Sequence, residues 1–296
     1  MRTERANAKI NAYLNVTGRR ENGYHNIVSI MQAVSLCDLV TVDFQPSSHT
    51  SIRLNASGNP AMPLDCRNLA YRAAEEFLKR TEQRGEVQIY IEKRIPMAAG
   101  LAGGSTDAAA VLRALNALSP KRLSKDELCA LGAGLGADVP FCICGGSARV
   151  SGIGEYMEEI APMPRVSLVV ACMGEGVSTP WAYGELDRKF DCFRGVANED
   201  SRPEKIATLW KNGEFLPSVE HFFNLFEEVV PAVQRDVDAV KEEMNRQGAI
   251  FSMMSGSGPS VFGAFANAEE AGRACEALRG MGAEAFVCHP CEKSLS

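Results

Sequence analysis

The chain has 296 residues, of which 46% are hydrophobic and 23% are charged, and its formal net charge is −6. This length allows one large or two ordinary domains with a sizeable buried core. A negative net charge is not typical of general nucleic-acid binders or of proteins that bind anionic membranes, so an anionic substrate needs a local site. The charged N-terminus and the short apolar runs predict neither a signal peptide nor a membrane anchor, and we expect a cytoplasmic protein.

The ten cysteines lie mostly within apolar patterns, which is typical of reduced core residues. The exception is Cys288-His289-Pro290-Cys291, which has the spacing of half a metal site or of a redox pair. No second cysteine pair at zinc-finger spacing completes it in the sequence, so we assign it no function.

The N-terminal region alternates apolar and polar residues over residues 9–16, which predicts a strand with Lys9 and Asn11 on one face. Asn22-Gly23 then predicts a tight turn, with Tyr24 and His25 just beyond it. The simplest interpretation is a hairpin followed by a second strand. The alternative is a turn that presents an aromatic ring for stacking and an imidazole for hydrogen bonds.

Further along the chain, strands are expected over residues 40–44, 51–54 and 87–91, and a helix over residues 68–80. Ser124-Lys125-Asp126-Glu127 has the pattern of a capping box, which predicts the start of another helix.

An apolar strand is expected over residues 166–171, just after Pro162 and Pro164. We place a domain boundary there, with an N-terminal domain over residues 1–162 and a C-terminal domain over residues 163–296. Because strands and helices are mixed without regular alternation, the pattern favours an α+β fold with two domains.

The most distinctive motif is the glycine-rich stretch Pro96–Asp107, between the strand over residues 87–91 and a helix expected over residues 107–115. A glycine loop that opens a helix lets backbone N–H groups approach an anion, and the helix dipole favours negative charge there. Ser105 and Thr106 add hydroxyls that suit a helix cap or the binding of phosphate and a metal. The stretch fits neither the Gly-x-x-x-x-Gly-Lys-Ser/Thr pattern nor the Gly-x-Gly-x-x-Gly pattern. It is therefore a phosphate-binding loop of a third kind or a flexible turn without a ligand.

Two further turns carry polar residues. Gly136-Ala137-Asp138-Val139-Pro140 places an acid before a proline, which is typical of a helix N-cap but also suits a carboxylate directed into a site. The segment Ser255–Ser260 lies between two apolar runs and is either a turn between strands or a backbone nest for an anion.

In this order, these motifs resemble the superfamily of galactokinase, homoserine kinase, mevalonate kinase and phosphomevalonate kinase. Three segments carry that resemblance: Lys9–Asn15, Pro96–Asp107 and Met254–Ser260. Within the superfamily, the chain resembles the 4-diphosphocytidyl-2-C-methyl-D-erythritol kinase family. The motifs that carry this narrower resemblance are Lys9-Ile10-Asn11, Thr17-Gly18-Arg19, Gly23-Tyr24-His25, Gly136-Ala137-Asp138-Val139-Pro140 and Gly176-Val177-Ser178-Thr179.

Three residues depart from the family pattern. Ala102 stands where Gly is usual, Thr106 where Ser is usual, and Asn22 where Asp is common. Ala102 is the change that bears on ATP affinity, because a Cβ restricts the backbone of a phosphate-binding loop.

The resemblance implies an N-terminal ribosomal-protein-S5-like kinase domain and a C-terminal ferredoxin-like α+β domain that completes the substrate site. It implies that ATP, with Mg²⁺, phosphorylates the 2-hydroxyl of 4-diphosphocytidyl-2-C-methyl-D-erythritol in the non-mevalonate route to isoprenoids. The expected partners are ATP and this small molecule, without nucleic acid or membrane, and the chain is expected to be a monomer or a weak homodimer.

Carried over residue by residue, the resemblance implies that Asp138 accepts the hydroxyl proton while Lys9 orients the hydroxyl and stabilises negative charge. It also implies that Tyr24 stacks on the cytosine, that His25 bonds the polar edge of the base, and that Tyr183 supplies a second aromatic wall.

The remaining implied roles concern the rest of the substrate and the nucleotide. Asn11 and Thr179 would hold the diphosphate and methylerythritol end beside Asp138. The implied ATP site consists of Asn68, Lys93, Pro96, Gly100, Leu101, Ala102, Gly103, Gly104, Ser105 and Thr106.

Two other functions stay open. A sister kinase that acts on homoserine or mevalonate would keep the glycine loop but has no use for a cytosine stack at Tyr24. A non-catalytic nucleotide sensor would bind ATP without releasing ADP, and the presence of both Lys9 and Asp138 counts against it.

Overall fold

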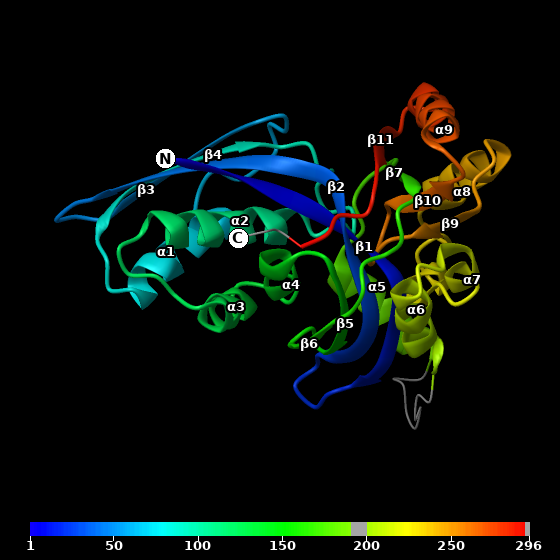
Figure 1. Ribbon diagram of the computed structural model, residues 1–296, viewed down its shortest axis with the longest axis horizontal. Helices are drawn as coiled ribbons and strands as arrows, with labels where there is room; N and C mark the ends of the chain where they lie inside the picture. Colours follow the sequence, from blue (N-terminus) through cyan, green and yellow to red (C-terminus); the bar gives the residue numbers. More distant parts are fainter. Residues whose placement is uncertain (191–199, 294–296) are drawn as a thin grey trace. The chain divides into compact units, whose positions relative to one another are not determined.

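The computed structural model describes residues 1–190 and 200–293, which form two compact units. Unit 1 contains Met1–Ala8, Cys37–Ile95 and Ala102–Gly145. Unit 2 contains Lys9–Leu36, Pro96–Leu101 and the described residues from Gly146 onward. Two long strands, β1 (Arg2–Arg19) and β2 (His25–Pro46), contribute residues to both units (Figure 1).

In unit 1, a sheet is built from the first part of β1, the second part of β2, β3 (Ser51–Ser57) and β4 (Gly85–Glu92). β4 pairs antiparallel with β2, where Val42 lies opposite Ile89, and parallel with β3. The predicted strands over residues 40–44, 51–54 and 87–91 are thereby confirmed.

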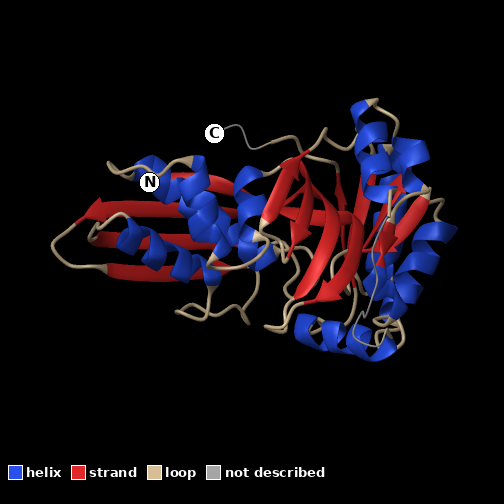
Figure 2. Ribbon diagram, turned by 90° about the horizontal axis from the view of Figure 1, so that it is seen from below, coloured by secondary structure: helices blue, strands red, loops and turns tan. Residues whose placement is uncertain are grey.

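Helices α1 (Leu69–Arg80) and α2 (Gly103–Leu118) cover one face of this sheet (Figures 1 and 2). Phe77 and Leu112 are fully buried, as is Ile91 of β4, so the core of unit 1 lies between the two layers. Two shorter helices, α3 (Lys125–Ala133) and α4 (Val139–Cys144), pack beside α2.

Local signals in the sequence set two of these helix starts. The side chain of Asn68 accepts a hydrogen bond from the N–H of Ala70 and caps α1. Ser124 and Glu127 form the predicted capping box of α3, with each side chain bonded to the other residue's backbone N–H. The predicted capping box is thus confirmed, and the helix expected over residues 68–80 is α1, which begins one residue later.

The predicted start of α2 is wrong. The helix begins at Gly103 rather than near Asp107, because Ala102 adopts a left-handed conformation with φ 58° and turns the chain into the helix. The N–H of Thr106 then bonds to the carbonyl of Ala102 at 2.9 Å. Ser105 and Thr106 therefore lie inside the first turn, and no side chain caps this helix.

In unit 2, the second part of β1 and the first part of β2 are joined by the predicted turn, in which Gly23 has φ 85°. β2 continues into an antiparallel pairing with β5 (Ser147–Gly152), which also pairs with β6 (Tyr156–Glu159). β1 pairs in parallel with the short strand β8 (Phe223–Asn224), where Tyr13 lies opposite Phe223.

Unit 2 also contains a four-stranded antiparallel sheet in the order β11-β7-β10-β9. Its strands are β7 (Ser167–Cys172), β9 (Phe251–Met254), β10 (Val261–Phe265) and β11 (Glu284–Cys288). Helices α8 (Asp236–Arg246) and α9 (Ala268–Gly280) pack against it, as the expected ferredoxin-like arrangement requires (Figure 1). The other helical segments of unit 2 are α5 (Thr179–Lys189), α6 (Arg202–Lys211), α7 (Phe215–Val219) and η2 (Leu225–Glu228).

Helices and largely antiparallel strands occur together in both units, which confirms the predicted α+β class. The strand expected over residues 166–171 is β7, whereas the domain boundary near Pro162 stays a prediction. In the described part of the chain, no helix has the length and apolar character needed to cross a membrane.

The nine cysteines within the described ranges are all free, and Cys66 is the exposed one among them. Across these ranges, no group of three or more His, Cys, Asp or Glu residues could hold a metal ion. Burial raises the pKa of the Cys288 thiol to about 12, so this member of the Cys-His-Pro-Cys motif is protonated at neutral pH.

Candidate active site

Lys9 is buried on β1 and is held by its own strand and by the glycine-rich stretch. Its ammonium donates to Asn11 Oδ1 at 2.7 Å and to the carbonyl of Gly100 at 3.0 Å. Asn11 Nδ2 in turn donates to Ser29 Oγ at 2.8 Å, which fixes the orientation of the amide. The predicted shared face of Lys9 and Asn11 is confirmed, and the third N–H of the Lys9 ammonium has no partner among the described residues of unit 2.

The middle of the glycine-rich stretch rests on the turn between β9 and β10. Gly100 has φ 76°, and a Cβ added to it would lie 2.2 Å from the carbonyl oxygen of Ser255, so only glycine fits there. Ser255 Oγ donates to the Gly100 carbonyl at 3.2 Å, and the N–H of Ser260 bonds to Ala99. Ser255–Ser260 is thus a turn between strands, and it supports the loop.

The part of the stretch that belongs to unit 1 lies beside the Asp138 turn. A Cβ added to Gly136 would lie 3.7 Å from Ser105 Oγ, which places this turn next to the first turn of α2. Thr106 Oγ1 donates to the carbonyl of Asn7 at 2.8 Å and is therefore occupied within the unit.

Asp138 occupies the N-cap position of α4, as one interpretation of the sequence expected. Its carboxylate makes no capping hydrogen bond, and it has no other hydrogen bond or ion pair among the described residues of unit 1. The carboxylate therefore does not serve as a helix cap. Lys9 belongs to unit 2, so the pairing of these two residues stays a proposal.

Asn68 and Lys93 are both engaged within unit 1. Asn68 uses its oxygen to cap α1 and its Nδ2 to donate to the carbonyl of Pro63 at 2.8 Å. Lys93 Nζ lies 2.6 Å from Asp38 Oδ2 and 2.7 Å from Asp107 Oδ2, and its side chain is 3% exposed. Its charge is therefore balanced inside the protein.

The ionisation of this cluster follows from its burial. Burial alone lowers the pKa of Lys93, but the charges of Asp107 and Asp38 outweigh that effect and raise it. Burial raises the pKa of the Asp107 carboxyl, and the neighbouring Asp38 carboxylate adds to the rise. Neither Asp38 nor Asp107 was predicted as a site residue. Asp38 is an acid inside the apolar run Leu36–Val40, and this position could have indicated a buried, paired carboxylate.

Two of the residues expected to bind a base, His25 and Tyr183, lie in an aromatic cluster in unit 2. The His25 and Tyr183 rings are stacked with centroids 4.5 Å apart, and Phe226 meets Tyr183 edge-on. His25 Nε2 lies 2.7 Å from Asp187 Oδ1. Tyr24 precedes this pair with its side chain 60% exposed. The structure thus brings His25 and Tyr183 together, with Asp187 as a partner that the sequence analysis missed.

The remaining predicted residues are distributed over the two units. Thr179 begins α5 and its hydroxyl lies 2.9 Å from Ser257 Oγ in the β9–β10 turn. Pro96 and Leu101 are buried in unit 2, where the carbonyl of Leu101 accepts a hydrogen bond from the N–H of Lys9. Gly103 and Gly104 form the first turn of α2 in unit 1.

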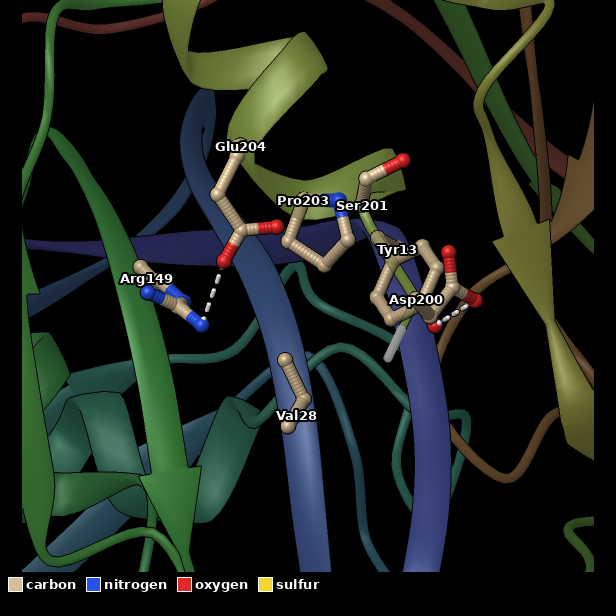
Figure 3. A pocket seen from close by; sticks show the side chains of 7 residues that line it. All are labelled: Tyr13, Val28, Arg149, Asp200, Ser201, Pro203 and Glu204. Carbon is tan, nitrogen blue, oxygen red and sulfur yellow. Dashed lines mark hydrogen bonds and ion pairs between the residues drawn. The ribbon is translucent and has the colours of Figure 1, made fainter. Parts of the chain in front are cut away.

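Unit 2 has a further cavity of about 280 Å³ between β1, β2, β5 and the start of α6 (Figure 3). Tyr13 donates from its hydroxyl to Asp200 Oδ2 at 2.6 Å, and Arg149 pairs with Glu204 at 2.6 Å (Figure 3). None of the predicted site residues lines this cavity. Arg149 pairs with Glu204, and Asp200 pairs with Arg202, which lies outside the cavity lining, so each charged group of the lining has a partner of opposite charge.

Comparison with known proteins agrees with this arrangement. The chain matches the GHMP kinases N terminal domain over residues 68–146 and the GHMP kinases C terminal domain over residues 212–284. It is 41% identical to 4-diphosphocytidyl-2-C-methyl-D-erythritol kinase of Clostridium botulinum (strain Eklund 17B / Type B), covering 96% of this chain and 98% of the relative. It is 40% identical to the enzyme of the same name from Gloeobacter violaceus, covering 96% and 92%.

Solved structures show the same likeness. A crystal structure of 4-(cytidine 5'-diphospho)-2C-methyl-D-erythritol kinase superposes with a TM-score of 0.78 at 35% identity, covering 98% of this chain and 99% of that chain. Homoserine kinase from Cytophaga hutchinsonii shares the fold, with a TM-score of 0.73 at 17% identity over 98% of this chain and 94% of that chain. The chain therefore belongs to the 4-diphosphocytidyl-2-C-methyl-D-erythritol kinase family of the GHMP kinases, and it is an ATP-dependent kinase with two α+β domains.

Proposed function

We propose that this kinase transfers the γ-phosphoryl group of ATP to the 2-hydroxyl of 4-diphosphocytidyl-2-C-methyl-D-erythritol, in the non-mevalonate route to isoprenoids. The observation that carries the choice of substrate is the stacked pair of His25 and Tyr183 in unit 2, next to the exposed Tyr24 in the sequence. Aromatic rings suit the face of a pyrimidine, and an imidazole held at a fixed angle suits its polar edge. Homoserine and mevalonate carry no base that would use this cluster.

In this proposal, the glycine-rich stretch binds the phosphates of ATP. The first N–H groups of α2 have no side-chain cap, so they remain available to an anion, and the helix dipole favours negative charge at the same end. The proposed nucleotide residues remain those of the sequence analysis: Asn68, Lys93, Pro96 and Gly100–Thr106.

Asp138 and Lys9 are the proposed catalytic residues. The proton of the substrate hydroxyl passes to the Asp138 carboxylate, and the hydroxyl oxygen bonds to the γ-phosphorus while the bond to the bridging oxygen breaks and ADP leaves. Because Asn11 and Gly100 hold the Lys9 ammonium, a fixed positive charge is ready for the negative charge that develops. Asn11 and Thr179 complete the proposed substrate side.

Mg²⁺ is part of the proposal. The Ser105 hydroxyl beside the Asp138 turn is an oxygen donor of the kind that Mg²⁺ prefers, and phosphate oxygens would supply the rest. When bound, the ion would neutralise charge on the phosphates.

The test is magnesium-dependent ADP release from ATP with the cytidyl substrate, run beside homoserine, mevalonate and galactose. We expect turnover with the cytidyl substrate alone, inhibition by CMP, and loss of turnover in Asp138→Asn with substrate binding largely kept. The matched control is Asp126→Asn, an exposed acid in the first turn of α3. A preference of the enzyme for another alcohol would contradict the proposed substrate. ATP binding without ADP release would favour a nucleotide sensor.

The proposal also places the enzyme in the cytoplasm, where ATP is available, as a monomer or a weak homodimer. Sedimentation velocity at several protein concentrations, with a thiol reductant present, tests the proposed oligomeric state. A tight dimer at micromolar concentration would contradict it.

A further inference from the structure

Three ionisable side chains, Asp38, Lys93 and Asp107, form a buried cluster in unit 1. Lys93 and Asp107 lie close in sequence to the two ends of the glycine-rich stretch. None of the three side chains is more than 3% exposed. The ammonium of Lys93 lies between the two carboxylates, at 2.6 Å from Asp38 Oδ2 and 2.7 Å from Asp107 Oδ2. These bonds join β2, the residue that follows β4, and α2.

Asp38 holds the chain that enters the loop. Its second oxygen, Oδ1, accepts hydrogen bonds from the backbone N–H groups of Arg94 at 2.5 Å and Ile95 at 2.9 Å. These two residues directly precede Pro96. The backbone at the entry to the loop is therefore fixed to β2 through a single carboxylate.

At the exit from the loop, Asp107 and Gly103 both lie close to the Lys93 ammonium. Asp107 lies one turn into α2, where it bonds to Lys93. A Cβ added to Gly103, the first residue of the helix, would lie 3.1 Å from Lys93 Nζ. Lys93 therefore sits directly against the first turn of α2, and a larger residue at position 103 would displace it.

Stability alone does not account for this cluster. Removing an ion pair and a further carboxyl group from water is costly, and well-packed apolar side chains of similar volume are often at least as stabilising. In addition, Asp107 Oδ1 is buried without a hydrogen-bond partner among the described residues. An unsatisfied buried oxygen in a native protein calls for an explanation other than packing.

We propose that Asp38, Lys93 and Asp107 are positioning residues, which fix the entry and the exit of the glycine-rich stretch relative to each other. In this way they set the direction of the first-turn N–H groups of α2 toward the phosphates of the nucleotide. Lys93, one of the proposed nucleotide residues, would then act through the helix and not through a contact between its side chain and the nucleotide. This inference rests on the proposed phosphate-binding function of the loop.

The main variant is Asp107→Asn, which keeps the shape and an oxygen for Lys93 but replaces the carboxyl group with an amide that cannot ionise. Its matched control is Asp126→Asn in the first turn of α3. We expect Asp107→Asn to raise both the Kd for ADP and the KM for ATP by about tenfold. The KM for the acceptor should stay within about twofold of the parent value. Amide hydrogen exchange at residues 103–106 should become faster in the nucleotide-free protein. The control should leave all of these values unchanged.

A double-mutant cycle separates positioning from direct binding. If the cluster acts as a unit, the Lys93→Met variant and the double variant that combines Lys93→Met with Asp107→Asn bind ADP equally weakly. If Lys93→Met weakens ADP binding while Asp107→Asn and Asp38→Asn do not, Lys93 is a direct ligand and the proposal is wrong. If circular dichroism shows that Asp107→Asn does not fold, Asp38→Asn is tested with the same measurements in its place. Its amide oxygen can still accept hydrogen bonds from the N–H groups of Arg94 and Ile95.

These outcomes are distinguishable from failure of the proposed function. ADP binding and hydrogen exchange need no acceptor. If the parent enzyme prefers another alcohol yet Asp107→Asn behaves as expected, the choice of substrate fails and the positioning role stands. If the parent phosphorylates the cytidyl substrate and Asp107→Asn binds ADP like the parent, the positioning role fails.

Discussion

The carboxylate of Asp187 holds the ring of His25, with Oδ1 lying 2.7 Å from Nε2. The other carboxylate oxygen lies 3.1 Å from Nη1 of Arg19, so the acid is itself fixed by a charge. A carboxylate on one ring nitrogen sets both the orientation of an imidazole and the position of its proton. With Tyr183 stacked on its face, His25 has little freedom left.

We therefore expect Asp187→Asn to raise the KM for the cytidyl substrate by about tenfold, because a charged hydrogen bond that orients the base-binding ring is lost. The KM for ATP should stay within about twofold. Glu185→Gln on the same helix is the control, since Glu185 pairs only with Arg188 among the described residues. Steady-state kinetics with each substrate varied in turn checks the prediction, and an unchanged KM for the cytidyl substrate would remove Asp187 from the site.

Ala102→Gly should raise the free energy of unfolding by about 0.5 kcal/mol. The left-handed φ of 58° costs an alanine about 1 kcal/mol, and glycine removes that cost but gains freedom in the unfolded chain. The KM for ATP should change less than twofold, since the loop already has the conformation that glycine prefers.

Urea unfolding of Ala102→Gly beside Ala109→Gly provides the check. Ala109 is buried in the middle of α2, where glycine should be destabilising by about 1 kcal/mol or more. The two substitutions should therefore have opposite signs. A loss of stability in both would mean that the conformation at Ala102 costs nothing.

Ser124→Ala should lower the free energy of unfolding by about 1 kcal/mol, because the N–H of Glu127 loses its capping oxygen. Both KM values should stay unchanged, since the helix α3 carries no proposed site residue. Glu127→Gln, which keeps an acceptor for the N–H of Ser124, should cost less. Thermal unfolding and the ADP-release assay on the three proteins test this.

Asp200→Asn should make the protein less stable at neutral pH and no less stable in strong acid. The hydrogen bonds from Arg202, together with the one from Tyr13, hold the pKa of Asp200 well below its usual range. A lowered pKa in the folded state contributes stability above the unfolded pKa of about 3.9, and this contribution is lost as the pH falls further.

Urea titrations of the parent and of Asp200→Asn at pH 7 and at several values below 4 give the difference in unfolding free energy. We expect it to be about 1 kcal/mol at pH 7 and to shrink steadily toward lower pH. Asp126→Asn should show no such trend. A difference that is constant with pH would mean that packing, and not charge, accounts for it.

Elements whose signals lie within a few residues could be predicted from the sequence. The cap at Asn68 and the capping box at Ser124 depend on neighbours two or three positions away. The alternation that placed Lys9 and Asn11 on one face of β1 is also local, and their contact at 2.7 Å agrees with it.

The start of α2 and the partners of Lys93 could not be predicted in this way. Gly103, Gly104 and Ser105 have low helix propensity, so the sequence favours a loop where the structure has the first helical turn. Asp38 is 55 positions from Lys93, and no periodic pattern links two such residues. The same holds for His25 and Asp187, which are 162 positions apart.

The exposed thiol of Cys66 bears on how this enzyme should be handled. It lies two residues before Asn68, on the surface of unit 1, while the other described cysteines are buried or half-buried. In aerated buffer, two molecules can therefore become covalently linked through Cys66 and sediment together without any native interface. A Cys66→Ser protein would sediment alike with and without reductant if this thiol is responsible, and the same thiol offers a position for attaching a fluorescent reporter near the proposed nucleotide residue Asn68.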